Sequence, residues 1–195
     1  MPDATSATGG FLALSPVPGL PDVEDVLHDL IVGITGLSDD LVRPRGQGEP
    51  PRTPAKDIDW CAFGITGSDP FTYPQIKHYP AGEGRDDVIS HEDLAVLVSF
   101  YGPRHFGLAW DLRAGIHVPQ NRSSLRPAGM AFIKAGTVTR LPELVQAGFR
   151  ARADLPLAFR RVVARSVAVL SLKQSGGSLE NETGVTVGFG CDGKE

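Results

Sequence analysis

One segment near the C-terminal end alternates between apolar and polar side chains over residues 150–163. Its apolar side holds Ala151, Ala153, Leu155, Leu157 and Phe159, and its polar side holds Arg152, Asp154, Pro156 and Arg160. A period of two residues is typical of a β-strand with one buried face and one solvent-exposed face. Because Pro156 has no N–H group for a strand ladder, we expect this strand at a sheet edge or at a bulge.

The first part of the chain predicts a helix followed by two short strands. Apolar residues recur at helical spacing over residues 23–34, and acidic residues gather at the start of that segment. Short β-type runs at 60–66 and 73–79 are separated by Gly67-Ser68-Asp69-Pro70. This turn sequence predicts that the two runs form a hairpin.

Three more elements are expected after the hairpin, in addition to the strand at 150–163. Residues 88–101 predict a long strand, because their alternation and β-branched content outweigh a capping-box pattern at 90–93. Gly102-Pro103 ends that strand and opens a second helix. Residues 130–139 predict a further strand.

These elements predict an α+β fold. We expect a mostly antiparallel sheet of about five strands, with two main helices packed on one face. Residues 22–172 are expected to form a single domain, preceded by an extended N-terminal arm at 1–21. The Gly-rich extension at 173–195 has few large apolar residues, so we expect it to order only against a partner.

Composition excludes several classes of protein. The net charge of −4 argues against nucleic-acid binding through counterion release. The longest apolar run has five residues, against about 20 for a membrane-spanning helix. The opening segment has no Lys or Arg before Arg43, so no signal peptide is expected. Because no signal peptide is expected, we expect a protein made in the cytoplasm. Cys61 and Cys191 form no C-x-x-C pair, which excludes a disulfide scaffold.

The motifs for chemistry are weak, and we expect no cofactor. Residues 188–193 spell G-x-G-x-x-G, but no helix can follow them to hold a pyrophosphate. The five histidines are not paired at metal-ligand spacing. Carboxylate pairs that could bind a divalent ion leave one enzymatic alternative open, a small metal-dependent hydrolase or nuclease using Asp57, Asp59, Asp86 or His91. A cytosolic binding module that regulates another protein is a third hypothesis.

Charge is unevenly distributed along the chain. Residues 1–42 carry seven acidic residues and no Lys or Arg. Residues 83–93 carry five acidic residues and one Arg, whereas residues 150–165 carry five Arg and one Asp. These segments are either two solvated faces or complementary surfaces between subunits. The second interpretation makes these residues candidates for subunit contacts: Asp86, Asp87, Glu92, Arg150, Arg152 and Arg160.

Several local runs resemble one known family. The runs are Arg43-Pro44-Arg45, Asp59-Trp60-Cys61-Ala62-Phe63-Gly64, Val98-Ser99-Phe100-Tyr101-Gly102-Pro103, Val118-Pro119-Gln120-Asn121-Arg122, Leu125-Arg126-Pro127-Ala128-Gly129 and Thr139-Arg140-Leu141-Pro142-Glu143-Leu144. Together they resemble the neck or tail terminator proteins of tailed bacteriophages over residues 23–170. The first 20 residues and the Gly-rich C-terminus lie outside this resemblance.

The resemblance implies a structural protein of the virion neck or tail, made in the host cytoplasm. It implies a ring, commonly of six copies, that ends the tail tube and joins it to the head connector. The expected partners are therefore further copies of the chain, the tail tube protein and connector proteins, with no membrane. DNA would cross the lumen without specific binding, because lumenal carboxylates repel phosphates. An edge strand, charged faces and loose arms suit such head-to-tail assembly.

Overall fold

Two long strands with alternating burial form the centre of the sheet. In the computed structural model, which describes residues 11–16, 20–46, 52–80, 84–145, 148–170, 174–180 and 186–192, strand β9 is Arg152–Ala168 and strand β4 is Arg85–Tyr101. The strands predicted at 150–163 and 88–101 are both confirmed. Most of the alternating apolar residues are buried as expected: Leu94, Val96, Val98 and Phe100 in β4, and Ala153, Leu155, Leu157 and Phe159 in β9. Two expectations for β9 are wrong, because Ala151 precedes the strand and is exposed, and Asp154 on the predicted polar side is buried.

The main sheet has seven strands in the described part of the chain, more than the five expected. Its central order is β1 (Val42–Pro44), β2 (Trp60–Pro70), β4, β9 and β5 (Met130–Ala135). Strand β3 (Gln75–Tyr79) also pairs with β4, and β6 (Thr139–Arg140) also pairs with β9. Strand β1 pairs with β2 in parallel, whereas β2 and β3 pair with β4, and β5 and β6 pair with β9, in antiparallel orientation.

The predicted hairpin of residues 60–66 and 73–79 is wrong. The supposed turn, residues 67–70, continues β2 and pairs with residues 92–95 of β4 after a register shift between Ile65 and Gly67. Both β2 and β3 therefore pair with β4 and not with each other. Gly and Pro signalled a turn, but a bulge next to Gly67 and the position of Pro70 at the strand end accommodate both residues in the sheet.

Of the two positions predicted for the strand around Pro156, a sheet edge or a bulge, the edge is wrong, whereas the pairing opposite Pro156 is irregular. Strand β9 lies between β4 on one side and β5 with β6 on the other. The carbonyl of Pro156 accepts a hydrogen bond from the Gly136 N–H at 2.8 Å, in the interval between β5 and β6. The N–H and C=O of a strand residue point to the same side. The position of the missing N–H therefore faces the gap between β5 and β6. Few hydrogen bonds of the sheet are lost there.

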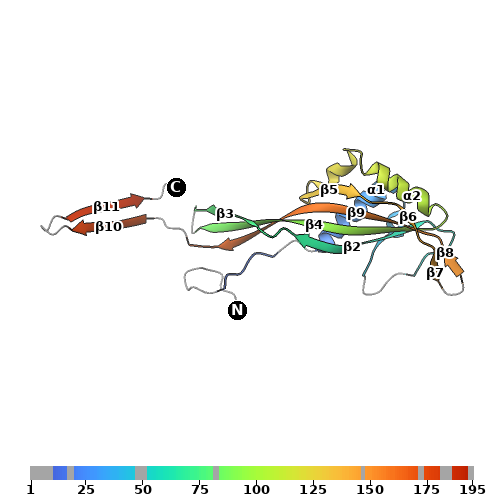
Figure 1. Cartoon of the computed structure of the whole chain (residues 1–195), viewed down its shortest axis with the longest axis horizontal. Coiled ribbons are helices and arrows are strands. Elements are labelled where there is room, and N and C mark those ends of the chain that lie inside the picture. Colours follow the sequence, from blue (N-terminus) through green and yellow to red (C-terminus); the bar gives the residue numbers. More distant parts are fainter. Residues whose placement is uncertain are drawn as a thin grey trace. The chain divides into compact units, whose positions relative to one another are not determined.

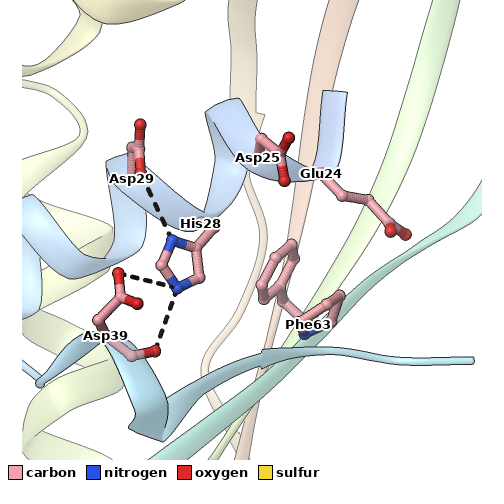
Figure 2. Close-up of a pocket in the computed structure, with 7 residues that line it drawn as sticks. Glu24, Asp25, His28, Asp29, Asp39 and Phe63 are labelled. Carbon is pink, nitrogen blue, oxygen red and sulfur yellow. Dashed lines mark hydrogen bonds and ion pairs between the residues drawn. The ribbon is translucent and has the colours of Figure 1, made fainter. Parts of the chain in front are cut away.

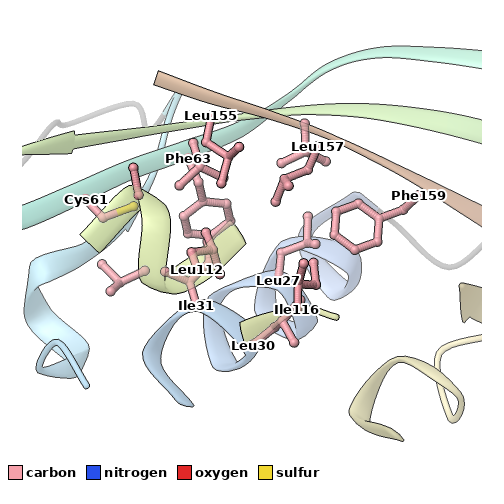
Figure 3. Packing of buried hydrophobic residues seen from close by; sticks show 14 of the residues in the cluster. Leu27, Leu30, Ile31, Cys61, Phe63, Leu112, Ile116, Leu155, Leu157 and Phe159 are labelled. Carbon is pink, nitrogen blue, oxygen red and sulfur yellow. The ribbon is translucent and has the colours of Figure 1, made fainter. Parts of the chain in front are cut away.

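Both predicted helices form and share one apolar core with the strands. Helix α1 is Leu20–Thr35 and buries Val23, Leu27, Leu30 and Ile31; helix α2 is His105–Gly115 and buries Leu108, Ala109 and Leu112. Figure 1 shows α1 and α2 beside strands β2, β4 and β9. Figure 3 shows side chains from these strands, including Phe63, Leu155 and Phe159, directed towards the helices. Within the described residues, no helix is both long and apolar enough to cross a bilayer.

The chain divides into two compact units. One unit is Pro18–Thr72 with His91–Val163, and it contains the helices, the 3-10 helices η2 (Asp39–Leu41) and η3 (Asn121–Leu125), and most of the main sheet. It also contains a small hairpin of β7 (Glu143–Val145) and β8 (Gly148–Arg150).

The other unit is Met1–Val17, Tyr73–Ser90 and Ala164–Glu195. In the described part of the N-terminal arm, the Ser15 N–H donates to the Ser166 carbonyl at 2.9 Å, and the Ser15 hydroxyl accepts from the Ser166 N–H at 2.8 Å. The C-terminal extension forms an antiparallel hairpin of β10 (Gln174–Glu180) and β11 (Thr186–Asp192). The extension thus pairs with itself, an arrangement that the sequence did not predict.

Candidate functional site

The acidic segment of β4 and the arginine-rich segment of β9 pair with each other within one chain. Arg160 Nε and Nη2 donate to the two carboxylate oxygens of Asp93 at 2.7 and 2.9 Å. Arg161 Nε donates to Glu92 Oε1, and Glu92 Oε2 accepts from the Ser68 hydroxyl at 2.7 Å. Two of the six candidate contact residues, Glu92 and Arg160, therefore already have opposite charges beside them on a neighbouring strand.

The two ion pairs differ in burial. The side chains of Arg161 and Glu92 are 9% and 14% exposed, whereas those of Arg160 and Asp93 are 42% and 36% exposed. The hydrogen bond from Arg160 lowers the pKa of the Asp93 carboxyl, so Asp93 stays charged further into acid. The Arg160 guanidinium also lies 4.6 Å from the ring centroid of Phe71. The Arg161–Glu92 pair is thus the inner, mostly buried pair. The Arg160–Asp93 pair is the outer one, which remains in contact with solvent.

Removing the inner arginine is expected to destabilise the fold more than removing the outer one. Arg161→Ala leaves the Glu92 carboxylate mostly buried without its cation, but the Ser68 hydroxyl still donates to it. We therefore expect the free energy of unfolding to fall by about 2 kcal/mol, less than the usual cost for a buried ion pair. Arg160→Ala is expected to cost less, because both partners in that pair stay hydrated. Urea unfolding of the two variants measures the difference. Equal losses would contradict this account.

Asp86 and Asp87 of β4 have different partners from those of Glu92 and Asp93. Asp86 Oδ1 lies 2.6 Å from Nδ1 of His78, its cross-strand partner on β3. Asp87 Oδ1 lies 3.0 Å from Nε of Arg85 and accepts a hydrogen bond from the Ser166 hydroxyl at 2.9 Å. The two candidate acids thus contact cationic or polar side chains of their own unit.

Arg152 belongs to a chain of polar side chains that continues into the core. Its Nε and Nη2 donate to both carboxylate oxygens of Asp154 at 2.7 and 2.8 Å, and these bonds raise its pKa. Asp154 also accepts from the fully buried Ser99 hydroxyl, which in turn accepts from Arg45 Nη2. Burial raises the pKa of the Tyr101 hydroxyl, whose ring lies 5.9 Å from the Arg152 guanidinium. Arg152 therefore stabilises this end of the sheet.

Arg150 differs from the other candidates because, among the described residues, it forms no ion pair, although Glu143 is its cross-strand partner. Its Nη2 donates to the Pro54 carbonyl at 2.9 Å. Its Nε is buried and has no hydrogen-bond partner among the described residues. Arg150 is thus the member of the candidate set whose hydrogen-bonding capacity is least satisfied within the described part of the chain.

The residues of the enzymatic alternative do not form one site. Asp59 Oδ1 accepts a hydrogen bond from the Arg104 N–H at 2.8 Å, beside the start of α2. A Cβ at Gly102, whose φ is +100°, would lie 2.5 Å from the same Asp59 oxygen, so this turn requires glycine. The His91 ring lies 6.0 Å from the ring of Phe71, and Asp86 contacts His78. Asp57 is exposed. Across the described ranges, no three His, Cys, Asp or Glu side chains are grouped so that they could hold a metal ion.

A cavity of about 500 Å³ lies beside α1 and is lined by acidic residues. Figure 2 shows the His28 ring between Asp29 and Asp39. His28 Nδ1 is 3.4 Å from Asp29 Oδ1, and Nε2 is 3.2 Å from the Asp39 carbonyl oxygen and 3.7 Å from its carboxylate. The full lining is Glu24, Asp25, His28, Asp29, Asp39, Pro44 and Phe63. The six acidic residues between positions 22 and 40, with no Lys or Arg among them, are the sequence signal for the acidic lining of this cavity.

The surroundings of His28 raise its pKa. Partial burial lowers this pKa, but the hydrogen bond to the Asp39 carbonyl, the hydrogen bond to Asp29 and the charges of both carboxylates raise it by more in total. A protonated His28 therefore adds stability that is complete below pH 6.5, the ordinary pKa of histidine, and is lost as the pH rises through the higher folded value. The cavity is thus least negative when His28 carries its proton.

The titration of His28 gives a direct test. In the folded chain we expect its ring resonances to titrate above pH 6.5 in an NMR experiment. Asp39→Asn should lower the midpoint, because it removes one attracting charge. His28→Gln should flatten the fall in stability that begins as the pH rises above 6.5. A midpoint below 6.5 would show that burial outweighs the acidic neighbours.

Comparison with known proteins identifies the family. A match to the family described as "Phage neck terminator protein" covers residues 22–183. The chain belongs to this family. Its matched range includes α1 from its third residue, α2 and every strand of the main sheet. No curated protein matches the chain.

Membership of the phage neck terminator family gives the chain a structural role. It is a component of the phage neck, and it interacts with other head or tail proteins. The resemblance seen in the local sequence runs is thereby confirmed, and the match extends beyond them at its C-terminal end, from residue 170 to residue 183.

Proposed function

We propose that six copies of this neck terminator form a ring that ends the tail tube and joins it to the head connector. DNA passes through the lumen of the ring and meets no specific binding site. The family match over residues 22–183 is the observation that carries this proposal. The net charge of −4 supports the passage of DNA, because an acidic surface repels phosphates.

The proposed mechanism is contact geometry without catalysis. It is supported by the contacts of Asp59, Asp86 and His91, each of which has a different structural neighbour. Such a protein acts by presenting complementary surfaces to the ring above and the ring below. Synthesis takes place in the host cytoplasm, and the protein functions only in the assembled particle.

The predicted domain division and contact residues remain part of this proposal. The core at 22–172 places α1 and α2 on one face of the sheet, and the arm at 1–21 and the extension at 173–195 reach the stacked neighbours. The candidate contact residues are Asp86, Asp87, Glu92, Arg150, Arg152 and Arg160. Four of these six, Asp87, Glu92, Arg152 and Arg160, form an ion pair within the described chain, and Asp86 contacts the His78 ring. We therefore propose Arg150 as the one with most to gain from a neighbouring subunit.

Deletion of the gene from the phage tests the proposed function. Without this protein, tails should lack a uniform end and should fail to join heads, and supplying the wild-type chain in trans should restore joined particles. Cryo-electron microscopy of complete particles should place the chain in a six-fold ring between tube and connector. Normal virions formed without the chain, or its absence from the neck, would refute the proposal.

A further inference from the structure

Opposite charges lie at the two edges of one sheet. In the unit formed by Pro18–Thr72 and His91–Val163, the central strand order starts at β1 and ends at β5. The chain before and along the β1 edge, residues 20–41, holds six acidic residues and no Lys or Arg. The chain that leads to the β5 edge, residues 102–142, holds five Arg and one Lys against one Asp.

The acidic edge is concave. The cavity of about 500 Å³ beside α1 also reaches β1 at Pro44 and β2 at Phe63. We name Glu24, Asp25, Asp29 and Asp39 the acidic surface. In the described residues none of these four carboxylates forms an ion pair with a Lys or Arg; the paired cation is His28, which contacts Asp29 and Asp39. The acidic surface therefore has charge available for a cationic partner.

The basic edge has a second cavity of about 270 Å³. It is lined by Arg122 and Arg126 of the η3 region and by apolar residues that include Leu125, Met130 and Phe132. We name Arg122 and Arg126 the basic surface. Toward other described residues, these two guanidinium groups make a single side-chain hydrogen bond, a long contact of 3.5 Å from Arg122 to the His117 carbonyl. No carboxylate of the described chain pairs with either arginine.

The two surfaces use different elements. Residues of α1, η2, β1 and β2 line the acidic cavity, whereas residues of η3 and β5 and their flanking segments line the basic one, and the two linings share no residue. Strands β2, β4 and β9 lie between β1 and β5, whereas α1 contacts η3. Within the described residues, however, no hydrogen bond or ion pair joins the acidic surface to Arg122 or Arg126. The opposite charges of the two surfaces are therefore not paired with each other in one chain, and both are available to other molecules.

We propose that the acidic surface of one copy binds the basic surface of the next copy in the ring. This inference rests on the proposed function and identifies a contact of that ring. A contact between two different patches of one chain is head-to-tail, and such contacts close into a ring when the rotation between copies permits. Arginine suits this contact, because its planar guanidinium can donate two parallel hydrogen bonds to one carboxylate.

Charge reversal tests the contact on the full-length chain. One variant carries Asp25→Lys and Asp29→Lys, a second carries Arg122→Glu and Arg126→Glu, and a third carries all four changes. Sedimentation velocity measures self-association, and negative-stain images report rings. Like charges across an interface cost several kcal/mol, so each double variant should raise the dissociation constant for self-association at least about 100-fold.

Two results distinguish this contact from a general effect of charge. The fourfold variant should regain assembly, because its exchanged surfaces are again complementary. An equimolar mixture of the two double variants should also assemble, with the two kinds of subunit alternating around the ring.

Asp57→Lys with Asp69→Lys is the control variant: it adds the same charge away from both surfaces and should assemble like the wild type. Neutral changes, Asp25→Asn with Asp29→Asn, should weaken assembly less than reversal and serve if a reversed variant fails to fold.

Several outcomes would overturn the inference. They are a wild-type chain that stays monomeric, double variants that assemble normally, and a fourfold variant or mixture that does not recover. The proposed function fails separately. If the reversed variants still form the ring in the neck of complete particles, the neck function stands and this contact is wrong. If virions form without the chain, the neck function itself is wrong.

Discussion

Phe159→Ala is expected to lower the free energy of unfolding by about 4 kcal/mol. Phe159 is fully buried in β9, and its ring meets that of Phe132 edge-on, with the ring centroids 5.9 Å apart. It lies in the cluster that joins the strands to α1 and α2. Truncation removes apolar contacts and leaves a cavity in a closely packed region. Urea unfolding followed by the fluorescence of Trp60 and Trp110 measures the loss.

Phe149→Ala is the matched control for this prediction. Phe149 lies in the β7 and β8 hairpin, where its side chain is 71% exposed opposite Leu144. The same chemical change there should alter the free energy of unfolding by no more than about 0.5 kcal/mol. Similar losses for both variants would mean that β9 does not supply the central core residues.

Asp154→Ala is the second change with a large expected effect. Asp154 is 7% exposed and binds both Arg152 and the Ser99 hydroxyl. Its removal takes away the carboxylate that binds the mostly buried Arg152 guanidinium through two hydrogen bonds, and it leaves Ser99 without its acceptor. Loss of one member of a buried ion pair costs about 3 to 5 kcal/mol, and we expect a loss near the lower value because Arg152 retains some contact with water and with Glu143.

A double variant separates unpaired charge from lost packing. Asp154→Leu combined with Arg152→Met removes both charges, so it should be less destabilising than Asp154→Ala alone. Asp69→Ala, at an exposed acid of β2, is the control for the loss of a carboxylate and should have little effect. A double variant less stable than the single one would indicate that the polar chain through Ser99 contributes more than charge compensation.

The elements with one strong periodic pattern could be predicted from the sequence. In α1, Leu27 and Ile31 are buried at helical spacing, and in β9, Leu155 and Leu157 are buried at a spacing of two. Each pattern is local and has one buried face, so the side chains alone define the element. The α+β class followed from the order of such elements, and the structure agrees with it at that level.

Strand pairing could not be predicted in the same way. Gly67 and Pro70 are common turn residues, yet here they extend β2, because the partner strand β4 continues beyond them. Pro156 is tolerated inside the sheet because the opposing ladder is interrupted between β5 and β6. In both cases the deciding contact comes from residues distant in the sequence.

The charged segments illustrate the same limit at the candidate site. The excess of acid around Glu92 and of arginine around Arg160 was visible in the sequence, but the sequence did not say which charges meet. Their cross-strand pairs to Arg161 and Asp93 satisfy much of that charge within one subunit. The acidic surface beside α1 was visible only as a run of carboxylates, and its cavity required η2, β1 and β2 to come together.

Strand β1 affects how copies of the chain can associate. It has three residues, ends at Pro44, and is the last strand at its edge of the described sheet. So short an edge, closed by a residue without an N–H, offers an incoming backbone few hydrogen bonds. Concentrated preparations should therefore not grow amyloid-like fibrils from this edge. Contacts between copies at this edge must therefore depend on side chains. Changes in salt concentration or pH can reverse such contacts.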